Sequence, residues 1–283
     1  MRSKAHGDAV GFRQGPFNWY KCFAMPTWAP EQYLQFASER TRPCQDLVDR
    51  VAIESPGRAI DLGCGPGNST AVIAKRWPRS EIIGLDGSAE MIEKARRDAP
   101  ARKWMVGDIS QWAQRDDGQF NLVFSNAALQ WVEDHAAVFP RLLRRVAPGG
   151  ALAFQMPANY DAPAHTAMRR LTASTTWKAH FGSGGVREWH AHDLPFYYDV
   201  LSPHATRLDG WVTEYLHVMP SARAIVDWYK GTGLRPFLDA LPDEARRSDF
   251  TADYLKEIEK SYPPQADGKI LFPFRRLFVI AYR

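Results

Sequence analysis

The sequence predicts an α/β protein with a doubly wound, mostly parallel sheet of seven strands. From Arg58 onward, short apolar runs alternate with amphipathic segments over roughly 100 residues, which is the pattern of strands joined by helices. Hydrophobic residues make up 45% and charged residues 24% of the 283 residues, so intrinsic disorder, collagen and a coiled coil are excluded as the main architecture. No apolar stretch approaches the ~20 residues of a membrane helix, so we expect a globular protein with no membrane partner.

Five of the strands are expected in the first part of the chain, separated by helices. A helix at 69–77 follows the first strand, and a helix at 88–98 begins at Ser88 as its N-cap. A further helix at 138–146 is expected to end at the Pro-Gly-Gly of residues 148–150. Ligands of such sheets bind at the carboxyl ends of the strands. The expected strands are residues 58–63, 81–86, 103–106, 120–124 and 151–156.

The pattern changes after Pro157. A helix is expected at 164–179, a glycine-rich break at 182–185, and an aromatic strand at 206–219. Strands that are separated by helices predict that this half completes the sheet and lays a helical cap over its ligand edge. The remaining expected elements are helices at 221–230 and 243–260 and terminal strand-like runs at 269–272 and 276–282.

Charge and cysteine content exclude several function classes. The net charge is +4, but residues 1–24 hold four basic residues and one acidic residue, so they contribute +3 and the remainder is +1. Basicity therefore does not indicate a nucleic-acid partner. The three cysteines form no CxxC pair, so we expect neither a metal site nor a disulfide framework, and a reducing cytoplasm fits. They are Cys22, Cys44 and Cys64.

The sharpest motif lies in residues 61–70, where the first strand must turn into a helix. Its glycines, Gly63, Gly65 and Gly67, allow the backbone to approach a bound ligand closely. The spacing is GxGxG, whereas the dinucleotide fingerprint requires a third glycine at Asn68, and the Gly-Lys-Ser/Thr of a P-loop is missing. The loop therefore indicates a nucleotide-like ligand other than NAD or ATP.

An acidic residue lies at the end of each of the next two expected strands, where the first would meet the ribose and the second the adenine of a nucleoside. Asp86 lies about 20 residues after the loop, where a carboxylate can accept both ribose hydroxyls. Asp108 and Ile109 end the third strand and suit an adenine amino group and ring face. Taken singly, such a strand-end Asp is more often a cap or turn residue.

This series of motifs resembles the class I S-adenosylmethionine-dependent methyltransferases, which have a Rossmann-like fold. The resemblance implies S-adenosyl-L-methionine as cofactor and S-adenosyl-L-homocysteine as product. It also implies that the loop holds the amino acid part of the cofactor, that Asp86 binds the ribose, and that the sulfonium faces the end of the fourth strand. The implied cofactor residues are Asp61, Gly63, Gly65, Gly67, Asn68, Asp86, Ser88, Asp108, Ile109, Ser125 and Asn126.

Nucleic-acid methyltransferases are disfavoured within this class. Those that alkylate base amino groups resemble one another in an Asn/Asp/Ser-Pro-Pro-Tyr/Phe motif after the fourth strand, and residues 125–131 do not match it. The only Pro-Cys is Pro43-Cys44, upstream of the loop, so Cys44 is interpreted as structural. Paired arginines fall on amphipathic helices, where a solvated face is the usual explanation.

Arginines and aromatic residues in loop-like or capping contexts remain to be explained. A guanidinium matches a carboxylate with two parallel hydrogen bonds, so several in one pocket would select a polycarboxylate. Spacing alone favours the alternative, in which these arginines pair with Asp and Glu at domain seams. The set is Tyr33, Phe36, Arg40, Arg42, Tyr197, Tyr198, Trp228, Arg235 and Arg276.

From Trp28 onward the chain closely resembles the trans-aconitate 2-methyltransferase family. The most discriminating motifs are Leu-Gln-Trp at 129–131 and Thr-Gly-Leu-Arg-Pro at 232–236, together with Gln-Met-Pro at 155–157. The family esterifies one carboxylate of trans-aconitate, so the resemblance implies a tricarboxylate substrate and a monomethyl ester product. Departures from its pattern are Arg275, Ala158 and residues 1–24. The implied substrate-binding residues are Arg235, Arg40, Arg42, Arg276, Tyr33, Tyr197, Trp131 and Trp228.

These inferences divide the chain into three parts. Residues 1–24 are expected to be a non-native or disordered extension. Residues 25–157 are expected to form the cofactor-binding core with an N-terminal helical arm, and residues 158–283 to complete the sheet and add the substrate cap. The sequence indicates no oligomeric state.

The expected substrate requires no catalytic base, because a carboxylate with a pKa near 4.3 is already ionised at pH 7. Two alternatives stay open. One is a methyltransferase for another small acid or a hydroxylated metabolite, for which His135 or His217 would serve as the base. The other is a protein that binds S-adenosylmethionine without turnover. A structural role is the favoured interpretation of both histidines.

Overall fold

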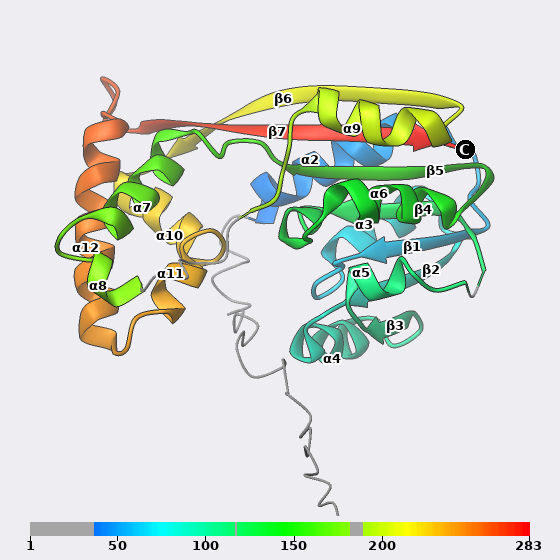
Figure 1. The fold of residues 1–283 in the computed structure, drawn as a ribbon, viewed down its shortest axis with the longest axis horizontal. Helices are drawn as coiled ribbons and strands as arrows, with labels where there is room; N and C mark the ends of the chain where they lie inside the picture. The colour runs from blue at the N-terminus through cyan, green and yellow to red at the C-terminus, as the bar shows by residue number, and fades with distance from the viewer. Residues whose placement is uncertain (1–36, 117, 182–188) are drawn as a thin grey trace, which may run out of the picture.

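The computed structural model describes residues 37–116, 118–181 and 189–283, and its centre is a seven-stranded sheet (Figure 1). The strand order is β3-β2-β1-β4-β5-β7-β6. β7 runs antiparallel to β5 and β6, and the other pairings are parallel, which confirms the expected mostly parallel sheet. The strands are β1 (Arg58–Leu62), β2 (Glu81–Asp86), β3 (Lys103–Val106), β4 (Phe120–Asn126), β5 (Val146–Pro157), β6 (Arg207–Met219) and β7 (Ile270–Tyr282).

Helices cover both faces of this sheet, and the side chains of each strand alternate between two cores. In β1, Ile60 and Leu62 pack with α5, α6 and α9, whereas Ala59 packs with α2 and α3. Helix α4 begins at its expected N-cap, because the Ser88 hydroxyl accepts a hydrogen bond from Met91 N at 3.3 Å. The helices are α2 (Ala37–Arg50), α3 (Asn68–Arg76), α4 (Ala89–Asp98), α5 (Ile109–Trp112), α6 (His135–Arg144) and α9 (Leu194–Leu201), with 3₁₀ turns η2 (Leu129–Trp131) and η3 (Ser202–His204).

A second apolar core lies at one end of the molecule, where β6 and β7 continue past β5 (Figure 1). β5 pairs with β7 only from Arg276 onward, so residues 270–275 pair with β6 alone. Phe272 and Phe274 of this extension pack against the surrounding helices. We call these helices the helical lobe. They are α7 (Pro163–Ala173), α8 (Lys178–Phe181), α10 (Ala222–Lys230), α11 (Arg235–Asp239) and α12 (Glu244–Ser261).

The terminal strand β7 is continuous through Pro273, whereas two separate runs at 269–272 and 276–282 were expected. Proline has no N–H to donate to a sheet ladder, so it is normally confined to edges. Pro273 lies opposite Leu216 in the part of β7 that has only β6 as its neighbour. On the side of β7 that faces away from β6, Pro273 has no neighbouring strand among the described residues, so the missing N–H costs no hydrogen bond there.

Two of the expected helices have different boundaries, and some observed helices have no counterpart among the expected elements. The helix expected at 164–179 is interrupted after Ala173, where the Ser174 hydroxyl donates to Leu171 O at 2.7 Å and competes with the helical hydrogen bonds. Helix α6 ends at Arg144, and residues 148–150 lie within β5 rather than closing a helix. Helix α9 was not expected, although Asp193 caps it by accepting from Phe196 N at 3.2 Å.

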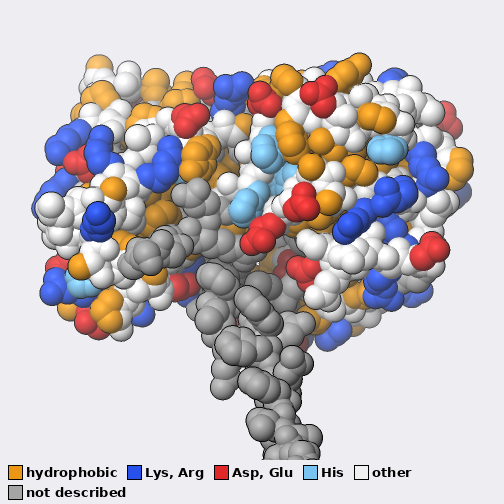
Figure 2. Space-filling view, in the orientation of Figure 1, with side chains coloured by type: hydrophobic (Ala, Val, Ile, Leu, Met, Phe, Trp, Pro, Cys, Tyr) orange, Lys and Arg blue, Asp and Glu red, His pale blue; other side chains and the backbone are white. Residues whose placement is uncertain are grey.

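The surface carries charges of both signs. Figure 2 shows Lys and Arg side chains interspersed with Asp and Glu across the face in view. Within the described ranges no helix is long and apolar enough to cross a membrane. The same residues contain no group of three or more His, Cys, Asp or Glu side chains that would hold a metal ion.

Gly84 of β2 is expected to tolerate no side chain. A Cβ there would lie 2.4 Å from the Trp104 ring and 2.9 Å from Cys64 Sγ, and both residues are buried. We expect Gly84→Ala to lower the free energy of unfolding by about 1 to 3 kcal/mol through overpacking, as measured by urea denaturation. Gly57→Ala is the matched control, because its nearest heavy atom is 3.5 Å away. Equal stability of the two variants would contradict the prediction.

Candidate active site

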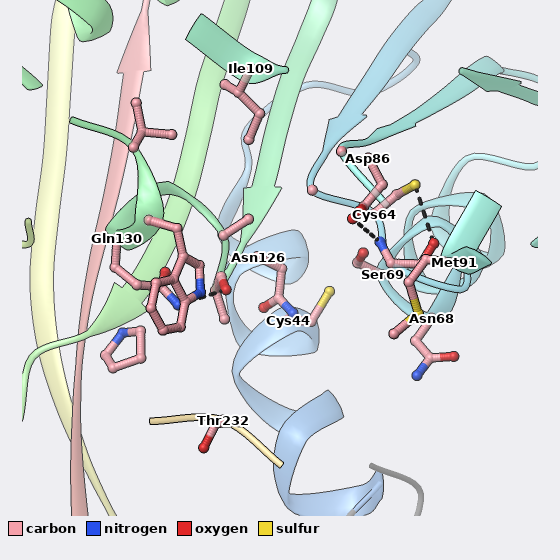
Figure 3. Close-up of a pocket in the computed structure, with 18 of the residues that line it drawn as sticks. Cys44, Cys64, Asn68, Ser69, Asp86, Met91, Ile109, Asn126, Gln130 and Thr232 are labelled. Carbon is pink, nitrogen blue, oxygen red and sulfur yellow. Dashed lines mark hydrogen bonds between the residues drawn. The ribbon is translucent and has the colours of Figure 1, made fainter. Parts of the chain in front are cut away.

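A cavity lies where the carboxyl ends of the parallel strands face the helical lobe. Its floor comes from the loops after β1, β2, β3 and β4, and its opposite wall from α10, the start of α11 and β7. Helix α2 contributes Thr41 and Cys44. Figure 3 shows residues from these elements pointing into one space, with Asp86 and Asn68 on one side and Gln130 on the other. This is the position expected for the ligand of a doubly wound sheet.

The glycine loop lines this cavity with backbone. Gly63 has a φ of +71°, and a Cβ there would lie 2.1 Å from the Cβ of Ala128, so only glycine fits. Gly65 has a φ of +54° and no atom within 4 Å of the position a Cβ would take. Its N–H donates to Asp86 Oδ2 at 2.8 Å, which ties the loop to the end of β2.

Asp61 lies beneath the loop and does not line the cavity. Its side chain is 0% exposed, and Oδ2 accepts hydrogen bonds from Ser69 at 2.7 Å and Thr70 at 2.6 Å. Burial raises the pKa of Asp61 to about 6, although the two hydroxyls oppose the shift. The structure therefore gives Asp61 a role in holding the start of α3 in place.

The expected ribose and adenine residues come together at the cavity floor. Asp86 Oδ1 accepts from Ser88 N at 2.8 Å, and each of its carboxylate oxygens keeps a second lone pair for a ligand. Burial raises the pKa of Asp86. Asp108 caps α5 by accepting from Gln111 N at 2.9 Å, and Ile109 beside it presents an apolar side chain. Carboxylate acceptors beside an apolar surface match the hydroxyl and amino donors and the ring face of a nucleoside.

Of the remaining cofactor candidates, some line the cavity and others lie outside its lining. Asn68 and Asn126 line the cavity. Ser125 lies outside the lining, because its buried hydroxyl donates to Leu62 O at 2.8 Å and joins β4 to β1. Gly67 and Ser88 also lie outside it, in the turn before α3 and at the N-cap of α4.

Arg276 is the charged group on the wall opposite the glycine loop. Along β7, every second residue faces the same side, so Phe272 and Phe274 enter the lobe core while Phe278 and Ile280 enter the core beneath α2 and α3. Arg276 lies between these two apolar groups, where the cavity opens, and is 4% exposed. Its guanidinium lies 4.7 Å from the Phe274 ring centroid, and Nη1 donates to Gln155 Oε1 at 3.2 Å.

Two of the expected aromatic residues line the cavity beside this arginine. Trp131 makes an edge contact with Trp189 at 5.8 Å between centroids, and both line the cavity. Trp228 of α10 is buried and lines it from the lobe. Arg276, Trp131 and Trp228 are thus the expected substrate residues that the structure brings together.

The structure corrects the placement of three other expected substrate residues. Tyr197 is 0% exposed in the sheet core, where its hydroxyl lies 2.8 Å from His135 Nδ1, so it does not close the cavity. Arg235 forms an ion pair with Asp239 at 3.0 Å beside a separate depression of the lobe. Arg42 is exposed, with its guanidinium 5.2 Å from the Tyr215 ring centroid.

Two substrate expectations fall outside what the structure describes. Tyr33 precedes the first described residue. Arg40 belongs to α2, and nothing is described of its side chain. The expectations for residues 1–24 and for the break at 182–185 also lie outside the described ranges.

Comparison with known proteins decides the family. Residues 59–150 match a family model described as a methyltransferase domain. A trans-aconitate 2-methyltransferase of Azoarcus sp. (strain BH72) is 46% identical over 260 residues, which cover 92% of this chain and 100% of that protein. One from Variovorax paradoxus (strain S110) is 42% identical over 259 residues, 92% of this chain and 99% of that protein. The chain belongs to the trans-aconitate 2-methyltransferase family.

Membership in this family places the chain among the class I S-adenosylmethionine-dependent methyltransferases. Solved structures share the fold at low sequence identity. The YcgJ protein of Bacillus subtilis aligns with a TM-score of 0.56 at 15% identity, covering 86% of this chain and 99% of that one. A Haemonchus contortus phosphoethanolamine N-methyltransferase 2 solved with S-adenosyl-L-methionine gives 0.51 at 14% identity, covering 85% of this chain and 52% of that one.

Two of the departures from the trans-aconitate 2-methyltransferase pattern, Ala158 and Arg275, lie together, away from the cavity that holds the glycine loop. Ala158 N donates to Arg275 O at 2.9 Å, and both residues line a second depression on the other side of β5 and β7. Arg275 lies opposite Glu214 in the pairing of β7 with β6. Neither residue lines the cavity that holds the glycine loop.

Several lining residues were not among the sequence candidates. Gln130 and Thr232 belong to motifs that are shared with the trans-aconitate 2-methyltransferases, so those motifs were the available signal. Cys44 was interpreted as structural, and it is both buried and part of the lining. The other unexpected members include Thr41, Val72, Met91, Trp189 and Phe274. Val72 and Met91 lie on α3 and α4, which follow the loops of the cavity floor, and the other three come from elements distant in sequence.

The buried Asp61 carboxyl predicts a specific pH dependence of stability. Its pKa rises from 3.8 to about 6 on folding, so the folded state binds a proton that the unfolded state releases between these values. The contribution is fully present below pH 4 and is lost as pH rises through 6. At about 1.4 kcal/mol per pKa unit, the wild type should lose roughly 2 to 3 kcal/mol relative to Asp61→Asn between pH 4 and pH 7.

The measurement is the free energy of unfolding in urea for both proteins across this range. Asp98→Asn serves as control, because Asp98 pairs with Lys94 at the surface, where ion pairs contribute little. Its difference from the wild type should vary by less than about 0.5 kcal/mol. A difference between wild type and Asp61→Asn that stays constant with pH would show that Asp61 titrates normally.

Proposed function

We propose that this enzyme transfers a methyl group from S-adenosyl-L-methionine to one carboxylate of trans-aconitate, giving a monomethyl ester and S-adenosyl-L-homocysteine. The observation that carries the proposal is a buried guanidinium, that of Arg276, facing the glycine loop across one cavity. Relatives that are 42% to 46% identical over 92% of the chain bear the name of this activity. The proposal therefore rests on both family and site chemistry.

The cavity floor fits the cofactor. Gly63 and Gly65 present backbone to its amino acid part, and Asp86 offers lone pairs to the ribose hydroxyls. Ile109 and Met91 offer apolar surface for the adenine ring, and Asp108 offers an acceptor for its amino group. When bound, S-adenosyl-L-methionine supplies an electrophilic methyl group on a cationic sulfur.

The opposite wall fits a polycarboxylate anion. A guanidinium binds carboxylates through two parallel hydrogen bonds, so Arg276 in the cavity wall suits a carboxylate of the substrate. Trp131, Trp228 and Phe274 line the same cavity as Arg276, and their apolar rings limit the access of water to an anion bound there. Because a guanidinium withdraws charge from the oxygen it binds, Arg276 is expected to hold a carboxylate that does not react.

The reaction needs orientation rather than proton removal. The attacking carboxylate is ionised at pH 7, and holding it in line with the methyl group contributes up to ~7–11 kcal/mol to catalysis. Among the described residues, no histidine lines the cavity. His135 hydrogen-bonds to Leu129 O at 2.9 Å and to Tyr197, and burial lowers its pKa to about 4. A hydroxylated substrate that requires a base is therefore the less favoured alternative.

The direct test is methyl transfer to trans-aconitate, cis-aconitate, isocitrate and citrate in parallel. We expect kcat/KM to be highest for trans-aconitate and the product to be its monomethyl ester, identified by NMR. We also expect kcat to change less than twofold between pH 7 and pH 9, because the nucleophile is fully ionised there.

Two outcomes would contradict the proposal. Cofactor binding without transfer to any of the four acids would retain the fold and remove the substrate assignment. A kcat that rises tenfold per pH unit through neutrality would indicate a base and favour a hydroxylated metabolite.

Arg276→Lys tests the anion site. Lysine keeps the charge but loses the planar fork, so we expect KM for trans-aconitate to rise at least tenfold while the dissociation constant of S-adenosylhomocysteine stays within twofold. Arg207→Lys is the matched control, because Arg207 stacks on Tyr282 at the far end of β7. An unchanged KM in Arg276→Lys would exclude Arg276 from substrate binding.

A further inference from the structure

Three polar side chains on adjacent strands form a chain of hydrogen bonds at the edge of the cavity. Gln155 of β5 is directly opposite Asn126 of β4, and Arg276 of β7 is opposite Pro157 of β5. Arg276 Nη1 donates to Gln155 Oε1 at 3.2 Å, and Gln155 Nε2 donates to Asn126 Oδ1 at 2.6 Å. Gln155 is 0% exposed, and Asn126 and Arg276 both line the cavity.

The chemistry of arginine fixes the direction of the whole chain. A guanidinium has only donors, so Gln155 must turn its oxygen towards Arg276. Its amide nitrogen then faces Asn126, which must offer its own oxygen. The orientation of both amides therefore follows from Arg276 and is not an arbitrary choice between oxygen and nitrogen.

The Asn126 amide nitrogen is consequently the atom left for a ligand. Asn126 is half-buried in the cavity wall, and within the described residues its Nδ2 donates no hydrogen bond. In the view of Figure 3 its side chain lies between those of Gln130 and Cys44. An N–H donor suits an anion and opposes a cationic sulfur, so it matches the substrate better than the cofactor.

We propose that Gln155 is a positioning residue that makes Asn126 a second donor for the substrate carboxylates, beside Arg276. This inference rests on the proposed function and deepens it. It also changes the role of Asn126 from the expected contact with the cofactor to a contact with the substrate.

Glutamine is the residue type that this position requires. Its amide accepts at one end and donates at the other, so it joins a donor-only guanidinium to an amide oxygen while leaving none of its own polar atoms unpaired. A glutamate would accept from both sides. It would pair with the Arg276 charge and make Asn126 rotate, so that an oxygen would face the cavity.

Gln155→Glu is therefore the decisive variant. We expect its KM for trans-aconitate to rise at least tenfold, with a smaller change in kcat and a dissociation constant for S-adenosylhomocysteine within twofold of the wild type. Gln119→Glu is the matched control, because Gln119 is an exposed glutamine just before β4. Its kinetic constants should equal those of the wild type.

Asn126→Asp tests the same inference if Gln155→Glu fails to fold. The aspartate still accepts from Gln155 but presents an oxygen to the substrate, so KM should rise at least tenfold and cofactor affinity should stay within twofold. Saturating trans-aconitate should restore most of the rate in this variant. A merely structural role would instead lower stability and cofactor affinity together.

The outcomes separate this inference from the function on which it rests. A wild type that methylates none of the four acids overturns both. A wild type that methylates trans-aconitate, together with either variant folded and within twofold of its KM, overturns the positioning role alone. A rise in KM that is matched by an equal loss of cofactor affinity also overturns it.

Discussion

The geometry of the site depends on how the chain leaves β1. Between Leu62 and Asn68 the backbone must end a buried strand, pass under a ligand and start a helix. A buried carboxylate makes this possible, because Asp61 accepts from two hydroxyls of α3 and fixes the helix start. Asp86 ties the middle of the loop to the neighbouring strand. Asp61 thus holds the start of α3 through two side chains and Asp86 holds the loop backbone, so hydrogen bonds within the protein shape the cavity floor.

The sequence predicts this half of the molecule well because its signals are local. The alternation of apolar strands and amphipathic helices, the GxGxG spacing and the N-cap at Ser88 each depend on neighbouring residues, and the structure contains all three. Asp108 and Ile109 were predictable in the same way, because they directly follow a strand and the carboxyl ends of parallel strands line the cavity. These local signals predicted the fold and the cofactor site. The substrate class was predicted only by the family resemblance, and comparison with relatives confirms the family.

The substrate side was harder to predict because its residues meet only through tertiary packing. Tyr197 and Arg276 are both polar residues near aromatic ones in sequence, yet one is buried with His135 and the other opens into the cavity. The difference is set by strand register for Arg276 and by the unexpected helix α9 for Tyr197. Gln155 was visible only as part of a motif, since its function depends on two partners 29 and 121 positions away.

The continuity of β7 has a mechanical consequence. β7 pairs with β5 and β6 in the sheet, and its first residues pack in the lobe core. No loop interrupts the strand at Arg276. Lobe and sheet are therefore joined at this point by an unbroken ladder rather than by a flexible linker. The separation between the glycine loop, which follows β1, and Arg276 of β7 is therefore fixed by the sheet that contains both strands.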